Sequence, residues 1–229
     1  MSLYRFLILG LTLSFIPSFA QQKNTPLQAT LAKLDDASAH FTSAQASFHK
    51  DLYNALVKET TPQDGTIYFI RNKSGATQMG AKIVGAGART VEYKNGTLRD
   101  YNPGIKCFDT VAASGNKART ESFLTLGFGG SGRDLARVWV IEDLGPDTLI
   151  EDGKNVKVEK LDLVPKEQSV GSMVTHVTLW LDLERGVSLK EIFFSPSGDT
   201  QTALYSKIHL NEKKVDLKAF EIKGSPCGK

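Results

Sequence analysis

Residues 91–101 read Val-Glu-Tyr-Lys-Asn-Gly-Thr-Leu-Arg-Asp-Tyr, and this stretch decides the fold class. Apolar or aromatic residues alternate with polar ones on either side of Asn95-Gly96, the dipeptide most typical of a two-residue hairpin turn. The stretch therefore predicts two antiparallel strands joined by a tight turn.

The same alternation, which is typical of β-strands, recurs along the chain on both sides of this hairpin. The further runs are Ala44–Phe48, Gly65–Arg71, Gln78–Gly85, Asp147–Ile150, Val156–Val164, Val174–Leu183, Leu189–Ser195, Thr202–Leu210 and Val215–Ile222. Strands and helices do not alternate regularly, so a doubly wound parallel sheet is disfavoured. The pattern predicts a mainly β, α+β domain with a meandering antiparallel sheet of about ten strands.

Two helical segments interrupt the strands. Thr25 is a suitable N-cap and Pro26 a suitable first helical residue, so we expect an amphipathic helix over residues 26–39. The second segment spans Thr120–Val138. This order fits a strongly curved sheet with helices packed against one opening.

The N-terminus has the pattern of an export signal. Arg5 precedes the apolar stretch Phe6–Phe15, and Ser18-Phe-Ala20 is a small-x-small cleavage pattern. We expect cleavage after Ala20 and one exported domain over residues 21–229. An uncleaved anchor is the alternative.

The net charge disfavours one class of function, and the two cysteines suggest a disulfide. The net charge of +3 is near balance and does not favour nucleic-acid binding. Cys107 and Cys227 would lie in a compartment where disulfides persist, and a bridge between them would contribute roughly 4 kcal/mol in the chain-entropy model. Two unpaired thiols are the alternative.

No catalytic arrangement emerges from the motifs. Gly127-Phe-Gly-Gly-Ser-Gly132 formally matches a dinucleotide-binding fingerprint, but the pattern before it is helical, so a flexible joint between two short helices is the simpler interpretation. The four histidines show no metal-ligand spacing. We therefore expect a protein that is not an enzyme and binds no cofactor or metal.

Apolar side chains are abundant in the strands, so a curved sheet of this width could enclose a ligand cavity or a fully packed core. By alternation, nine residues are candidates for its inner face. They are Ile67, Phe69, Met79, Ile83, Val91, Tyr93, Leu179, Leu181 and Phe193.

The order of several short motifs resembles the LolA family of periplasmic lipoprotein carriers. The motifs are Phe41-Thr-Ser-Ala44, Gly65–Arg71, Asn95-Gly-Thr97 through Tyr101-Asn-Pro103, Leu161-Asp-Leu-Val-Pro-Lys166, Leu179-Trp-Leu-Asp182 and Phe220-Glu-Ile222. The resemblance implies an open, unclosed half-barrel capped by helices. It also implies a monomeric carrier that shelters the acyl chains of lipoproteins or other lipids between an inner-membrane release complex and an outer-membrane acceptor.

The resemblance also suggests roles for individual residues. The nine inner-face residues would contact acyl chains, and ordinary core packing is the alternative. Arg71 aligns with a basic residue that bonds the helical lid and lets it open. Gly127, Gly129 and Gly132 would then form the lid hinge.

Some features depart from the family pattern. Arg99 stands where the family usually has tryptophan or another apolar residue, and the chain is longer near Lys58–Asp64. The cargo of such a divergent member could be another lipidated molecule. A periplasmic sensor or scaffold that binds a protein partner through the same half-barrel is the competing hypothesis.

Overall fold

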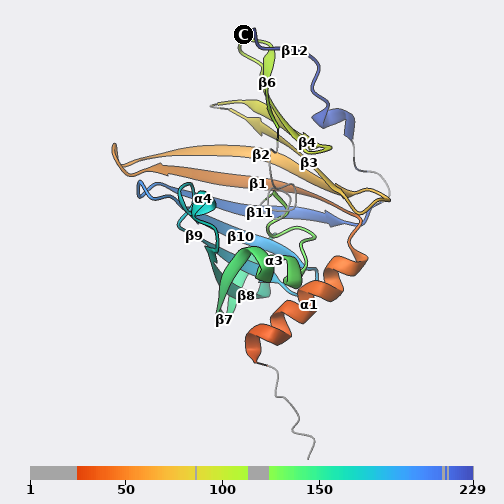
Figure 1. Cartoon of the computed structure of the whole chain (residues 1–229), viewed down its shortest axis with the longest axis vertical. Coiled ribbons are helices and arrows are strands. Elements are labelled where there is room, and N and C mark those ends of the chain that lie inside the picture. The colour runs from red at the N-terminus through yellow and green to blue at the C-terminus, as the bar shows by residue number, and fades with distance from the viewer. Residues whose placement is uncertain (1–24, 86, 113–123, 213–214, 216, 229) are drawn as a thin grey trace, which may run out of the picture.

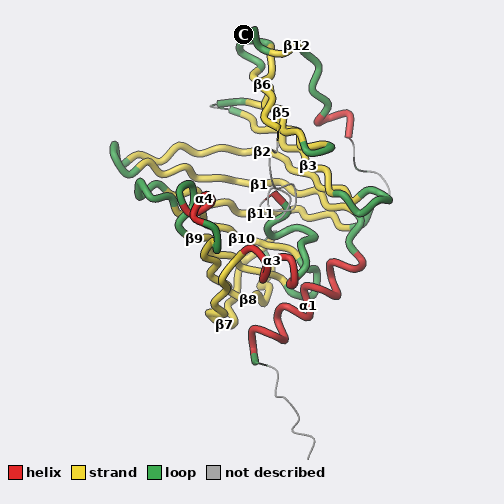
Figure 2. Tube along the Cα trace, in the orientation of Figure 1, coloured by secondary structure: helices red, strands yellow, loops and turns green. Residues whose placement is uncertain are grey.

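A computed structural model describes residues 25–85, 87–112, 124–212, 215 and 217–228. The proposed export signal lies outside this part of the chain. The described residues form one antiparallel sheet, with a single parallel pair at one edge, and a few short helices (Figures 1 and 2). The predicted mainly β architecture is confirmed.

The sheet has twelve strands. They are β1 (Ser43–Asn54), β2 (Glu59–Arg71), β3 (Thr77–Val84), β4 (Arg89–Lys94), β5 (Thr97–Asn102), β6 (Cys107–Ala112), β7 (Trp139–Glu151), β8 (Lys154–Pro165), β9 (His176–Asp182), β10 (Val187–Phe194), β11 (Thr200–Leu210) and β12 (Ser225–Pro226). Their order is β12-β6-β5-β4-β3-β2-β1-β11-β10-β9-β8-β7. Because β12 and β7 do not pair with each other, the curved sheet stays open.

The deciding hairpin forms where the sequence predicts it. Asn95 and Gly96 join β4 to β5 with φ angles of 53° and 77°. Both angles lie in the left-handed region that a primed hairpin turn requires, and Asn and Gly adopt it at low cost. Local turn chemistry thus sets the register in which Tyr93 faces Leu98.

Helix α1 (Pro26–His40) matches the predicted first helix within one residue. Thr25 and Gln28 form a reciprocal capping box at its start. Helix α3 (Gly132–Val138) packs beside α1, where Arg133 pairs with Asp35 (Figure 1). Among the described residues no helix is both long and apolar enough to cross a membrane.

The second predicted helix is only partly correct. Residues 120–123 lie outside the described part, residues 124–131 are mostly turns, and α3 begins only at Gly132. The glycines explain the difference, because Gly127 and Gly129 adopt φ angles of 76° and 73° that a helix cannot contain. A short helix, α4 (Gln168–Gly171), was not predicted.

The C-terminal strand predicted at Val215–Ile222 is wrong. Leu217–Phe220 forms a 3₁₀ helix, η1, which lies against β3 and β4. Phe220 packs on Tyr68 with ring centroids 4.3 Å apart. A strand after β11 would need a free neighbour, but β11 already pairs with β1 and β10, so the chain crosses to the opposite edge.

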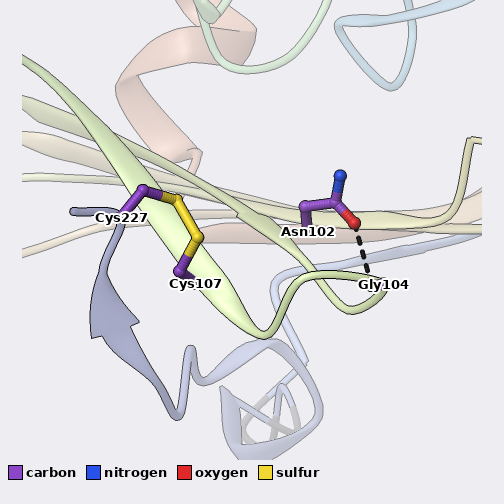
Figure 3. The surroundings of a disulfide bond; sticks show 4 residues. All are labelled: Asn102, Gly104, Cys107 and Cys227. Carbon is purple, nitrogen blue, oxygen red and sulfur yellow. Dashed lines mark hydrogen bonds between the residues drawn. A yellow bond between two sulfur atoms is a disulfide. The ribbon is translucent and has the colours of Figure 1, made fainter. Parts of the chain in front are cut away.

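At that edge the tail is held by β6, a strand that the sequence analysis missed. Ser225 and Pro226 pair in parallel with Cys107 and Phe108, and the Cys107–Cys227 disulfide follows directly (Figure 3). The bridge links residues 120 positions apart. The predicted pairing of the two cysteines is present in the structure.

We predict that replacing both cysteines by serine lowers the free energy of unfolding by about 4–5 kcal/mol, because a loop of this length restricts the unfolded chain. Denaturant titration of both proteins measures the difference. Wild-type protein under reducing conditions should match the double variant, and equal stability with and without the bridge would contradict the prediction.

Candidate functional site

The inner face of the sheet is the face on which Phe69, Tyr93 and Leu179 lie. Across β2 to β5, Phe69 is opposite Met79, Met79 is opposite Tyr93, and Tyr93 is opposite Leu98. These four side chains form a continuous apolar row. Phe69 and Tyr93 are only 2% and 1% exposed, so something covers the row.

The plug loop, which we define as residues 124–131, provides the cover. Phe128 stacks on Phe69 with centroids 4.8 Å apart and meets Tyr205 edge-on at 4.9 Å. Leu126 instead enters the second apolar cluster, built around β8, β9 and α3. The plug loop thus packs on the apolar row at Phe69, while a cleft of about 450 Å³ stays open elsewhere beside Phe48, Leu189 and Tyr205.

Backbone contacts tie the plug loop to β10. Ser188 N–H donates to the Gly127 carbonyl at 2.7 Å, and Phe128 forms a β-bridge with Val187. Gly127 also lies directly over Glu191, where a Cβ atom would overlap the carboxylate oxygen Oε1. The loop therefore approaches the sheet as closely as a glycine backbone allows.

The other two predicted hinge glycines are also contact points. A Cβ at Gly129 would overlap the Phe41 ring, and one at Gly132 would overlap the backbone of Leu31 in α1. These contacts explain why glycine is needed at both positions. Movement about them stays a prediction.

Arg71 connects the sheet to both covering elements. Its guanidinium donates to the Ser38 carbonyl near the end of α1 and to the Gly129 carbonyl of the plug loop, each at 2.5 Å. Ser38 Oγ also donates to the Gly129 carbonyl, at 2.8 Å, and the guanidinium lies 5.3 Å from the Phe41 ring centroid. We call this set of contacts the Arg71 latch. The role of Arg71 in opening the lid stays a prediction.

A cleft runs along the seam between the Arg71 latch and α3. It has a volume of about 420 Å³ and includes Arg71, Thr77, Thr125, Leu135 and Arg137 in its lining. The latch is therefore reachable from outside the sheet.

One polar group lies among the apolar residues of the inner face. Glu191 is 3% exposed, and its Oε2 accepts a hydrogen bond from Tyr205 Oη at 3.1 Å. Burial raises the pKa of Glu191 to about 8, although Tyr205, Lys50 and Ser188 each act to lower it. Burial likewise raises the pKa of Tyr205 well above its ordinary value.

The nine predicted inner-face residues fall into three groups. Ile67, Phe69, Met79 and Tyr93 pack in the cluster that contains Phe128. Leu179, Leu181 and Phe193 pack in the cluster that contains Leu126. Ile83 and Val91 are half-buried and belong to neither cluster.

The sequence analysis missed Phe128 and Glu191. An aromatic residue between Gly127 and Gly129 was the available sign that the glycine-rich segment is an insertion into a core. For Glu191, the sign was a carboxylate at an inner-face position two residues before Phe193.

No protein-family model and no curated protein matches the sequence. Among solved structures, MucB in the MucA/MucB complex of Pseudomonas aeruginosa is similar at a TM-score of 0.50 and 14% identity, over 85% of this chain and 60% of MucB. An uncharacterised conserved protein from Thermus thermophilus is similar at 0.50 and 8% identity, over 83% of this chain and 90% of that one.

The LolA superfamily protein NE2245 from Nitrosomonas europaea is similar at 14% identity and a TM-score of 0.41, over 86% of this chain and 98% of that one. The chain shares the fold of MucB and of the Thermus thermophilus protein. It spans only about three fifths of the length of MucB. The MucA/MucB complex shows that MucB binds a protein partner.

We predict that Arg71→Leu exposes the plug loop, because the substitution removes the charged donor of the latch. Hydrogen bonds to a charged group contribute about 1.5–3 kcal/mol. Chymotrypsin should cleave after Leu126 or Phe128 faster than in wild type. Arg133→Leu is the control, since Arg133 is a largely exposed arginine on α3 whose partner among the described residues is Asp35. Equal cleavage of both variants would show that Arg71 does not hold the loop.

Proposed function

We propose that this protein is a periplasmic carrier that shelters the acyl chains of lipoproteins or related lipids between the inner face and a displaced plug loop. The observation that supports this most is the way the loop occupies the inner face. Its apolar side chains enter two separate clusters, yet polar contacts at Gly127 and Gly129 hold its backbone. Such a loop can leave without unfolding the sheet beneath it.

The energetics suit a carrier. An acyl chain of about 16 carbons gains on the order of 12 kcal/mol when it leaves water, at roughly 0.8 kcal/mol per methylene. Exposing Leu126 and Phe128 costs about 1.5–3 kcal/mol each. Opening the Arg71 latch and ordering the acyl chain both cost free energy, so they reduce the net gain on binding further. The resulting affinity is moderate, which allows both uptake and release.

The proposed location follows from the N-terminal pattern and the disulfide. We propose export, cleavage after Ala20, and function in an oxidising compartment where the Cys107–Cys227 bridge is stable. The proposed partners are an inner-membrane complex that releases cargo and an outer-membrane acceptor. The proposed carrier acts as a monomer and as a binder, not as an enzyme.

Mass spectrometry of organic extracts tests the proposal most directly. Protein purified under native conditions should release acyl species at close to one per chain if the inner face holds one cargo. Lipid-free protein that also fails to take up added lipid would refute the carrier function.

A protein-binding function is the second candidate. It is favoured by the similarity to MucB, which is solved in complex with MucA. In this case the same half-barrel would hold a segment of a partner protein, and native purification would yield a protein complex without acyl species.

We predict that Phe128→Ala tightens the binding of a fluorescent fatty-acid probe, because an entering chain no longer has to displace the ring from Phe69. The same substitution should lower the free energy of unfolding by about 3–5 kcal/mol.

Phe220→Ala is the matched control, since it truncates an equally buried aromatic residue that packs on the outer-face residue Tyr68. It should lose stability without binding the probe more tightly. If both variants bind like wild type, the plug loop does not compete with cargo.

A further inference from the structure

Glu191 occupies the middle of the inner face. On the adjacent strands it is opposite Leu179 of β9 and Ala203 of β11, and Ala203 is in turn opposite Lys50 of β1. It therefore lies between the apolar cluster that receives Leu126 and the one that receives Phe128.

Only one of the two carboxylate oxygens of Glu191 accepts a hydrogen bond from a protein group. Oε2 accepts from Tyr205, whereas Oε1 is buried and accepts no hydrogen bond from any described donor. The single proton of the Ser188 hydroxyl beside it is best placed to bond the Lys190 carbonyl, at 2.8 Å, so Ser188 lowers the pKa of Glu191 without satisfying Oε1. Above Oε1 lies the Gly127 backbone.

The charged groups near Glu191 come from two strands. On β1, Lys50 forms no ion pair with Glu191 among the described contacts. Burial lowers the pKa of Lys50, the charge of Glu191 opposes that shift, and Arg89 adds to it. On β11, Tyr205 contributes only its hydroxyl. The neighbour on β9, Leu179, and the covering residue Gly127 carry no charge. Closure of the plug loop therefore removes water from a carboxylate that the protein does not fully compensate.

We propose that Glu191 is a proton-binding site that controls the plug loop, so that the loop closes over the neutral carboxyl group and opens when that group ionises. This rests on the proposed function, because it regulates access to the same inner face. A buried, uncompensated carboxylate is costly, whereas water that enters with the open loop solvates the charge.

The direction of the pH effect follows from linkage. With the loop closed the pKa of Glu191 is raised to about 8, and with the loop open and the group hydrated it returns toward 4.5. Between these values the closed state holds one more proton than the open state. Rising pH therefore shifts the equilibrium toward opening by up to about tenfold per pH unit, and the shift ends near pH 8. Acidification favours closure.

Hydrogen exchange of the full-length, disulfide-bonded protein without added lipid tests the proposal. After correction for intrinsic rates, protection of the amides in residues 125–130 should fall more than tenfold between pH 6 and pH 8. Amides in the middle of β1 and β2 serve as the internal reference. In Glu191→Gln the profile should be flat, because the neutral amide cannot ionise.

Two further variants serve as a control and as a second test of the pH dependence. Glu142→Gln changes an exposed carboxylate on the edge strand β7 and should keep the wild-type profile. Tyr205→Phe removes the donor to Oε2, so it should move the transition to higher pH, and it provides a test if Glu191→Gln does not fold. A flat wild-type profile, or an equal slope in Glu191→Gln, would overturn the proposal. Both results are independent of whether the protein carries acyl chains.

Discussion

Burial of the inner face is the constraint on which the rest of the structure depends. A closed barrel covers its interior by joining its edges, but here β12 and β7 stay apart. The apolar row from Phe69 to Leu98 would then face water, so another segment must cover it. The plug loop contributes to this cover with Phe128, which stacks on Phe69, whereas Leu126 enters the second apolar cluster. The covering segment is a loop that a small number of specific contacts attach to the sheet.

Polar contacts fix the position of the plug loop and help to hold it there, together with the apolar contacts of Leu126 and Phe128. Arg71 bonds two backbone carbonyls, one in α1 and one in the plug loop, so it fixes both covering elements against the same strand. Charged donors also suit the negative end of a helix, where carbonyl groups lack partners. At the far edge the disulfide holds the tail on β6 in a comparable way. Both the covering elements and the tail are thus secured by specific contacts.

Turns and helix starts could be predicted from the sequence, because a few neighbouring residues determine them. Contacts between distant segments could not be predicted. Asn95-Gly96 predicts its hairpin because two residues determine the turn, and Thr25-Pro26 predicts the start of α1 for the same reason. The strand expected at the C-terminus failed because β11 has no free side, which depends on the order of the whole sheet. The positions of Phe128 and Glu191 in the site could not be predicted, because they depend on the plug loop lying over β10 in the folded chain. Alternation identified the inner-face residues but could not show what covers them.

The position of Glu191 bears on the proposed displacement of the loop. An apolar side chain there would extend the apolar surface between the two clusters. A carboxyl group between them interrupts the apolar surface at the point where Gly127 crosses. The closed state then gains less from burial than its contact area suggests, because part of that gain offsets the cost of the unsatisfied oxygen. The proposed carrier function needs this balance, since cargo and loop would compete for the same surface.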